Sequence, residues 1–204
     1  CIKSNNMNKH RVFKHPKTNI SYIDTDDAIV GYSKSAIAKS EDNDCCVRAF
    51  ASVTESPYDD AHDYVKKIFK RKKGKGTPRF PLTMSQREGL KTLNGYKYKE
   101  LKNHDKTTFK KPVKYYSWED RKYKYRYVER TLDSKFYPLI TTYGKTRASQ
   151  MTVGTFIKEY NIGRYLIHVR GHAFTIIDGV VVGNSCDSKQ LKCRIVGAYK
   201  FYKK

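Results

Sequence analysis

Apolar residues recur at helical spacing shortly after the polar stretch SEDND at 40–44. Four of them fall on one side of a helix that would begin near Cys45, and these are Cys46, Ala49, Phe50 and Val53. Asp44 directly precedes this stripe, and a carboxylate there can accept hydrogen bonds from the free N–H groups of the first helical turn. The pattern therefore predicts a helix that is capped by Asp44 and carries Cys45 in its first turn.

Two further helices are predicted before residue 96. The Ser-Pro pair at 56–57 is typical of a helix start, and the apolar positions that follow it continue at helical spacing to Phe69. Thr83 followed by Gln86 forms a capping box, which predicts a third helix that continues past Leu90 and ends at the Asn-Gly pair 94–95.

The last third of the chain predicts one helix and then a sheet. Thr152 is placed to cap a helix that carries Val153 and Phe156. Apolar segments follow at 164–170, 172–178, 179–183 and 193–202. Asp178-Gly179 is a two-residue hairpin signal, which pairs residue 177 with 180. Helices first and strands last are the order of an α+β fold, with a C-terminal antiparallel sheet.

The chain of 204 residues is long enough for one ordinary domain. Residues 1–39 show no sustained period and predict an N-terminal arm that packs on a single domain over 40–204. Within that domain, tyrosines alternate with cations at 96–130, which predicts strands with one aromatic and one basic face. Burial of the aromatic face is the favoured interpretation, and a base-stacking platform is the alternative.

The charge of the chain indicates what kind of partner it meets. Its 42 Lys and Arg outnumber its 20 Asp and Glu, which gives a net charge of +22. Such a charge favours contact with nucleic acid, anionic surfaces or acidic proteins. We expect that contact at Lys70, Arg71, Lys72, Lys73, Lys122, Lys124 and Arg126. No membrane span is predicted, and the N-terminus lacks the apolar region of a signal peptide.

The five cysteines do not suggest a disulfide framework. Their number is odd, and Cys45 is adjacent to Cys46, so we expect a reducing compartment. A zinc site that uses Cys186 and Cys193 lacks the usual ligand spacing. No metal and no cofactor are predicted.

Cys45 is the strongest candidate for chemistry. A helix N-terminus stabilises a thiolate, and a nucleophilic thiolate also needs a base. His172 lies 127 residues downstream at the start of a predicted strand, after Gly171, which would let another backbone approach closely. Asn184 follows Cys45 by 139 residues and could orient the imidazole. This order and spacing are close to those of papain-type enzymes.

Three segments, NDCCVRAFA, MTVGTFIKEY and GRYLIHVRGHAFTIIDGVVVGNSCDS, resemble a group of phage-encoded papain-like cysteine peptidase-type proteins. The resemblance covers about residues 41–102 and 146–187. It implies a papain-like fold, with Cys45 as nucleophile, His172 as base and Asn184 as orienting residue.

Two features depart from the papain pattern. No Gln precedes Cys45 within residues 33–44, so the backbone N–H of Cys45, with the side chain of Asn43, would hold the oxyanion. The hairpin register places Asn184 opposite Ala173 and on the wrong face for His172, unless a bulge or a longer loop intervenes. Asp187 is the alternative orienting residue.

The sequence therefore predicts a thiol hydrolase, by default a cysteine peptidase or isopeptidase that acts on a protein or peptide. The alternative is a noncatalytic basic phage protein of the same fold that binds nucleic acid or packs in the virion. Either would act in the cytoplasm of an infected bacterial host or in the phage particle. Cys46 and His168 are interpreted as structural residues, and His62 is assigned no partner. Arg48 is interpreted as part of a structural ion pair, with the binding of a substrate carboxylate as the alternative.

Overall fold

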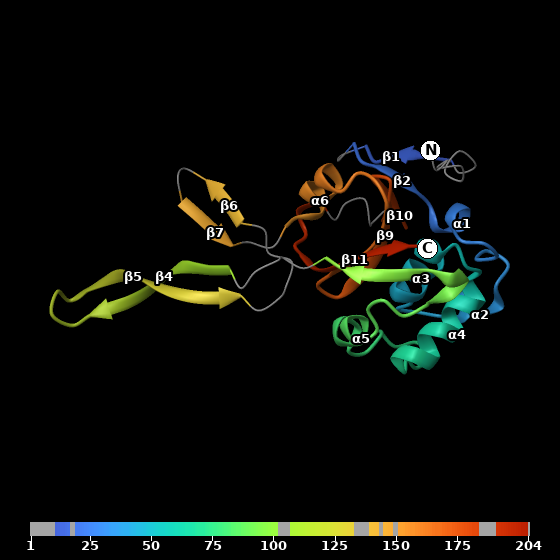
Figure 1. Ribbon diagram of the computed structural model, residues 1–204, viewed down its shortest axis with the longest axis horizontal. Helices are drawn as coiled ribbons and strands as arrows, with labels where there is room; N and C mark the ends of the chain where they lie inside the picture. The colour runs from blue at the N-terminus through green and yellow to red at the C-terminus, as the bar shows by residue number, and fades with distance from the viewer. Residues whose placement is uncertain are drawn as a thin grey trace. The chain divides into compact units, whose positions relative to one another are not determined.

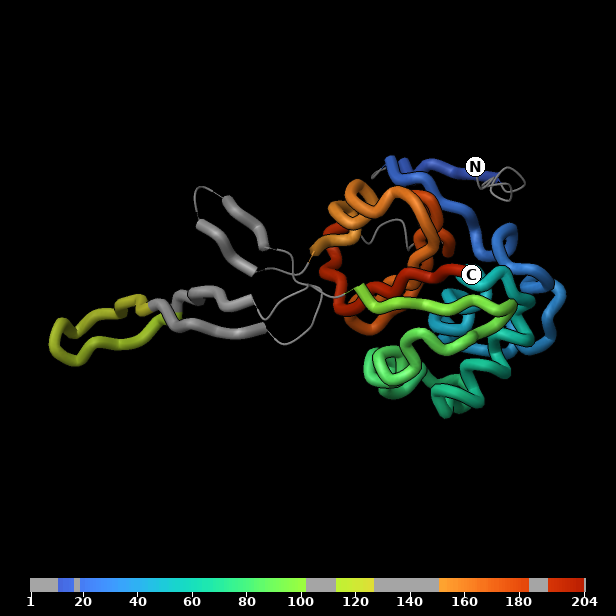
Figure 2. The backbone as a smooth tube through the Cα atoms, in the orientation of Figure 1, coloured from blue at the N-terminus to red at the C-terminus, as the bar shows by residue number. Residues whose placement is uncertain are grey.

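The computed structural model describes residues 11–16, 19–101, 107–132, 139–142, 145–148, 151–183 and 191–203 (Figures 1 and 2). They form two compact units, of which unit 1 comprises Cys1–Leu101 with Thr152–Lys204 and unit 2 comprises Lys102–Met151. The sequence predicts one domain over 40–204, whereas the division falls inside that range. Unit 1 also takes in the predicted arm.

Unit 1 is built on a mostly antiparallel sheet of seven strands in the order β1-β2-β10-β9-β8-β11-β3. The strands are β1 (Phe13–Lys14), β2 (Ser21–Ile23), β3 (Lys97–Glu100), β8 (Arg164–Val169), β9 (His172–Ile177), β10 (Val180–Val182) and β11 (Ile195–Tyr202). Figure 2 shows the green β3 beside the red β11, so the two chain segments of unit 1, which unit 2 separates in the sequence, meet in this sheet. The four C-terminal strands predicted from the sequence are confirmed.

The predicted hairpin between β9 and β10 is also confirmed. Val180 pairs with Ile177 and Val182 with Thr175, across Asp178 and Gly179, which both have positive φ. β10 then pairs in parallel with β2, which belongs to the predicted arm. The arm thus contributes β1 and β2 to the sheet, and its residues Ile23 and Ile29 are buried.

The helices of unit 1 are α1 (Thr25–Ala28), α2 (Ala36–Ser40), α3 (Cys45–Thr54), α4 (Tyr58–Phe69), α5 (Phe80–Gln86) and α6 (Val153–Glu159), with a 3-10 turn at Leu93–Gly95. The predicted helices at α3, α4 and α6 are confirmed, including the cap of α6, where Thr152 accepts a hydrogen bond from Thr155 N. In the part of the chain that the structure describes, no helix combines the length and the apolar character needed to cross a membrane.

The third predicted helix is displaced. α5 begins at Phe80, so Thr83 lies inside it rather than at its cap, and Leu90 is exposed. The physical reason is the burial of Phe80 and Met84, which are one helical turn apart and anchor this short helix to the core. The capping-box pattern was therefore misleading at this position.

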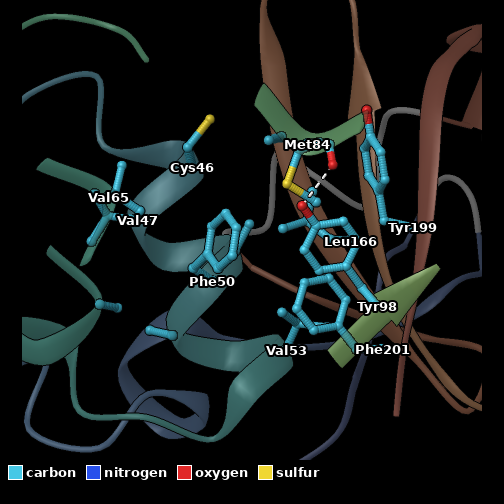
Figure 3. Packing of buried hydrophobic residues seen from close by; sticks show 14 of the residues in the cluster. Cys46, Val47, Phe50, Val53, Val65, Met84, Tyr98, Leu166, Tyr199 and Phe201 are labelled. Carbon is cyan, nitrogen blue, oxygen red and sulfur yellow. Dashed lines mark hydrogen bonds between the residues drawn. The ribbon is translucent and has the colours of Figure 1, made fainter. Parts of the chain in front are cut away.

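Helices cover both faces of the sheet. α3 and α4 bury Phe50 and Val65 against the face that carries Leu166 (Figure 3). The neighbouring Tyr165 points to the opposite face, because side chains alternate along a strand. There it packs edge-on against Phe156 of α6, with ring centroids 5.2 Å apart. Unit 1 is thus a sheet between two layers of helix.

Unit 2 contains two antiparallel hairpins. One pairs β4 (Thr107–Ser117) with β5 (Lys122–Leu132), and the other pairs β6 (Leu139–Thr142) with β7 (Lys145–Ala148). The favoured burial of the tyrosine faces holds for β3, where Tyr98 is 1% exposed. It is wrong for β5, where Tyr123 is 63% exposed. The two segments share one composition, but only β3 lies in a sheet that helices cover.

Candidate functional site

The C-terminal end of α3 is fixed to the sheet by Arg164 of β8. Its guanidinium donates to the carbonyl oxygens of Ser52 (2.6 Å) and Val53 (2.9 Å) and forms an ion pair with Glu55 (3.1 Å). Closer to Cys45, near the middle of the helix, Thr175 Oγ1 of β9 donates to the Ala49 carbonyl oxygen at 2.9 Å. These bonds fix the register of α3 on β8 and β9, and with it the position of Cys45.

Replacing Arg164 with Leu is expected to destabilise the protein by about 2 kcal/mol, because buried carbonyl groups and Glu55 lose a charged donor. Urea unfolding monitored by circular dichroism measures the change. The exposed Arg170, at the end of β8, supplies the matched control Arg170→Leu, for which we expect less than about 0.5 kcal/mol. Equal effects of the two substitutions would contradict the anchoring role of Arg164.

At the other end of α3, Cys45 meets the first two residues of β9. Its sulfur hydrogen-bonds with the Cys46 thiol, the His172 imidazole and the Ala173 N–H. The Cys46 thiol makes the largest contribution, and together these groups lower the pKa of Cys45 well below its usual range, although burial opposes the shift. The same contact and burial raise the pKa of Cys46, so Cys46 stays a thiol and Cys45 carries the negative charge.

The pair formed by Cys45 and His172 was predicted from sequence, and the structure brings the two side chains together. Cys45 is half-buried and so is open to solvent on one side. The His172 ring stacks on the buried Phe174, with ring centroids 5.9 Å apart and an interplanar angle of 24°. Phe174 thus supports the imidazole from behind. Gly171 has positive φ and open space around its Cα, so it serves the β8–β9 turn and not the close backbone approach expected from sequence.

Asp44 occupies the N-cap position of α3, but its side chain makes no capping hydrogen bond, which corrects the predicted role. The carboxylate instead accepts from Arg48 Nε and from the Tyr58 hydroxyl, both at 2.9 Å. The predicted structural ion pair of Arg48 is therefore confirmed. Because the carboxylate turns away, the first-turn N–H groups beside Cys45 are not capped by this side chain and can face an anionic group.

The segment before α3 is held by a buried carboxylate, Glu41. Its oxygens accept from Arg71 at 2.9 Å, from Gly74 N at 3.0 Å and from His62 at 3.1 Å. Burial opposes ionisation, but these three bonds lower the pKa of Glu41 to about 2. Asn43 adds to the junction, because its amide donates to the Gly74 carbonyl at 3.2 Å. The loop after α4 is thus tied to the residues that lead into Cys45.

The bonds around Glu41 correct the roles predicted for Arg71 and His62. Arg71 is 3% exposed and forms its ion pair with Glu41, so it cannot reach nucleic acid or an acidic partner. His62, which the sequence left without a partner, belongs to the same cluster. The other predicted cations of this segment, Lys70, Lys72 and Lys73, are exposed. In unit 2, Lys122 and Arg126 are exposed, while Lys124 forms an ion pair with Asp120.

The residues predicted to complete the site fall in different places. Asn43, the predicted oxyanion residue, lies two positions before Cys45 with one amide hydrogen already bound to Gly74. Asn184 and Asp187, predicted to orient His172, lie outside the described residues. Within the described part of the chain, no group of three or more His, Cys, Asp or Glu side chains is arranged to hold a metal ion.

His168 is the residue of this site whose position the sequence interpretation missed. It pairs with Ala173 across β8 and β9, and its ring contacts Phe80 with centroids 5.3 Å apart. Burial lowers its pKa, so it stays neutral beside the Cys45 and His172 pair. Its Nδ1 is buried without a hydrogen-bond partner among the described residues, so it is not the fully bonded core histidine expected. The sequence did contain a signal for the position of His168. The tight turn before His172 fixes the pairing of His168 with Ala173 and so places His168 beside the site.

Comparison with protein-family models, with curated proteins and with solved structures finds no match to this chain. The functional interpretation therefore rests on the geometry of Cys45 and its neighbours.

Proposed function

We propose that this protein is a papain-like thiol hydrolase, with peptide or isopeptide bonds as its default substrates. One observation carries the proposal: Cys45, at the N-terminus of a buried helix, hydrogen-bonds with His172 at the start of a strand 127 residues away. A packed helix and strand that direct a thiol and an imidazole toward each other form the arrangement that activates a cysteine nucleophile. The helix-on-sheet architecture of unit 1 supports a papain-like fold.

The chemistry follows from the charges at this pair. The proton of Cys45 resides on His172, and the thiolate attacks the acyl carbon, which forms a C–S bond and places negative charge on the acyl oxygen. The Cys45 N–H and its neighbours in the first turn of α3 stabilise that charge. When the tetrahedral intermediate collapses, the C–N bond breaks and the imidazolium gives its proton to the leaving amine.

The acyl group then remains on Cys45 as a thioester. His172, now neutral, removes a proton from an attacking water, and a second oxyanion forms at the same N–H groups. Collapse of this intermediate breaks the C–S bond, releases the carboxylic acid and returns the proton to the Cys45 and His172 pair. Cys46 keeps its proton throughout, because its pKa is raised, and donates a hydrogen bond to the Cys45 thiolate.

A covalent probe tests the proposal without a known substrate. Incubation with a peptidyl epoxide at pH 6, followed by peptide mass spectrometry, is expected to place a single adduct on Cys45, and hydrolysis of a fluorogenic peptide mixture is expected in parallel. Cys45→Ser should lose both. Cys193→Ser is the matched control, because it removes another half-buried thiol that is not among the groups stabilising the Cys45 thiolate, and it should retain both. Hydrolysis that survives in Cys45→Ser would refute the proposal.

A noncatalytic role gives the opposite set of results. Cys45 would then take up the epoxide no faster than a small free thiol, and neither substitution would change hydrolysis beyond background.

A further inference from the structure

The hairpin of β4 and β5 in unit 2 exposes an unusual amount of aromatic surface. Trp118 is 83% exposed, Tyr125 is 66% exposed and Tyr123 is 63% exposed. Tyr115 and Tyr116 are also exposed. Large apolar rings in solvent are costly when they are contiguous, and contiguous exposed patches are characteristic of binding surfaces. The thiol chemistry of unit 1 gives these rings no role.

The strand register sorts these side chains onto two faces. Tyr116 pairs with Tyr123, and Lys114 pairs with Tyr125, and directly paired residues share a face. We call this the aromatic face. The pairs Ser117 with Lys122, Tyr115 with Lys124 and Val113 with Arg126 form the other, basic face. One aromatic and one basic face were predicted from the sequence, and the register confirms this alternation for residues 122–126 of β5. β4 departs from it, because Lys114 lies on the aromatic face and Tyr115 on the basic face.

Contacts within the aromatic face support its rings but leave them accessible. Tyr116 meets Trp118 edge-on, with centroids 4.9 Å apart, and meets Tyr123 edge-on at 5.3 Å. Lys114 Nζ lies 4.2 Å from the centroid of the Tyr123 ring. The exposed fractions of Trp118, Tyr123 and Tyr125 show that most of each side chain remains in solvent despite these contacts. The hairpin thus presents aromatic surface next to a positive charge.

The charge around these rings indicates an anionic partner. Residues 113–126 contain five Lys or Arg and two carboxylates, and the chain as a whole carries a net charge of +22. Lys114 is exposed beside the Tyr123 ring on the aromatic face, and Lys122 and Arg126 are exposed on the basic face. Aromatic rings beside cations form the combination that binds unpaired bases and their phosphates.

Two other partners fit this hairpin less well. A membrane surface would meet Glu119 and Asp120 in the turn at 118–121, and carboxylates at the tip oppose insertion among anionic headgroups. Duplex nucleic acid hides its base faces in the stack and offers only base edges in its grooves, so it leaves the exposed rings of the hairpin without a stacking partner. A single strand alone offers both free base faces and phosphates.

We propose that the aromatic face of this hairpin binds single-stranded nucleic acid. Bases stack on Trp118, Tyr123 and Tyr125, and phosphates contact Lys114 on the same face. The strand then passes around the edge of the hairpin, where phosphates contact Lys122 and Arg126 of the basic face. The site is independent of the proposed thiol chemistry, so either could fail without the other.

Trp118 reports on this site directly, because it is the only tryptophan in the chain. Titration of the full-length protein with a 20-nucleotide oligothymidylate is expected to quench its fluorescence as bases stack. An abasic oligonucleotide of equal length has the phosphates without the bases and should cause little quenching. A blunt duplex of equal length should bind at least tenfold more weakly than the single strand at the same salt concentration.

Two double variants separate stacking from charge. Tyr123→Ala with Tyr125→Ala should weaken binding of fluorescein-labelled oligothymidylate at least tenfold, as measured by anisotropy. Val30→Ala with Leu82→Ala is the matched control, because it removes exposed apolar side chains from unit 1, and it should bind like the parent. Lys122→Gln with Arg126→Gln should lower the slope of log affinity against log salt by about 1.4, whereas Lys66→Gln with Lys67→Gln should not.

Several results would overturn the proposal. They are equal affinity of the tyrosine variant and its control, equal affinity for single strand and duplex, and binding to anionic phospholipid vesicles in place of the oligonucleotide. Cys45→Ser should bind the oligonucleotide as the parent does. Loss of hydrolysis in Cys45→Ser with intact binding therefore keeps the two proposals separate.

Discussion

Replacing His172 with Ala is expected to slow the alkylation of Cys45 at pH 6 by at least about 100-fold. The thiolate of Cys45 exists at this pH because the Cys46 thiol, His172 and the Ala173 N–H stabilise its charge. Without the imidazole, the thiol proton has no acceptor and the charge loses its counterion. A shift of two pKa units reduces the thiolate fraction about 100-fold at a pH below both values. Iodoacetamide kinetics with site-resolved mass spectrometry measure the rate.

His168→Gln is the matched control for this prediction. It removes a second imidazole from the same site, but burial keeps His168 neutral, so its loss should change the alkylation rate less than about threefold. A large effect of His168→Gln, together with a small effect of His172→Ala, would exchange the roles of the two histidines. Circular dichroism of both variants verifies that each is folded.

Replacing Glu41 with Gln is expected to cost about 3 kcal/mol of stability at pH 7, because Arg71 would lose its counterion where its side chain is 1% exposed. The ionised Glu41 also predicts a pH dependence. Its folded pKa of about 2 lies below the ordinary 4.5. The carboxylate therefore stabilises the fold above pH 4.5, and this contribution is lost as the pH falls from 4.5 toward 2.

The difference in unfolding free energy between the parent and Glu41→Gln should accordingly shrink as the pH falls below 4.5. Urea unfolding at pH 7, 4 and 3 measures it. Glu159→Gln, at the exposed C-terminal end of α6, is the matched control and should change stability little at any of these pH values. A difference that grows as the pH falls would contradict the assigned ionisation of Glu41.

The secondary structure near Cys45 could be predicted because local patterns determine it. The apolar stripe of α3, the capping residue Thr152 and the Asp178-Gly179 turn are all short-range signals. The position of α5 could not be predicted in this way. Its start depends on the burial of Phe80 beside His168 and Tyr199, which come from distant parts of the chain.

The candidate site shows the same limit. Cys45 and His172 could be paired from the chemistry and order of the residues. The Glu41, Arg71 and His62 cluster was missed, because Arg71 lies in a Lys-rich run and was grouped with its solvated neighbours. The aromatic face of the hairpin was interpreted as buried for a similar reason. Composition does not reveal whether a strand joins a covered sheet or an open ribbon.

The pH dependence of Cys45 alkylation in the parent protein tests the central claim most directly. Peptide-level mass spectrometry assigns the reaction to Cys45, and a small free thiol with a pKa of about 8.5 is the reference. We expect the midpoint for Cys45 to lie well below that of the reference, and we expect its alkylation to proceed at pH 6. A midpoint at or above 8.5, or a Cys45 that does not react, would contradict an activated thiolate at the N-terminus of α3.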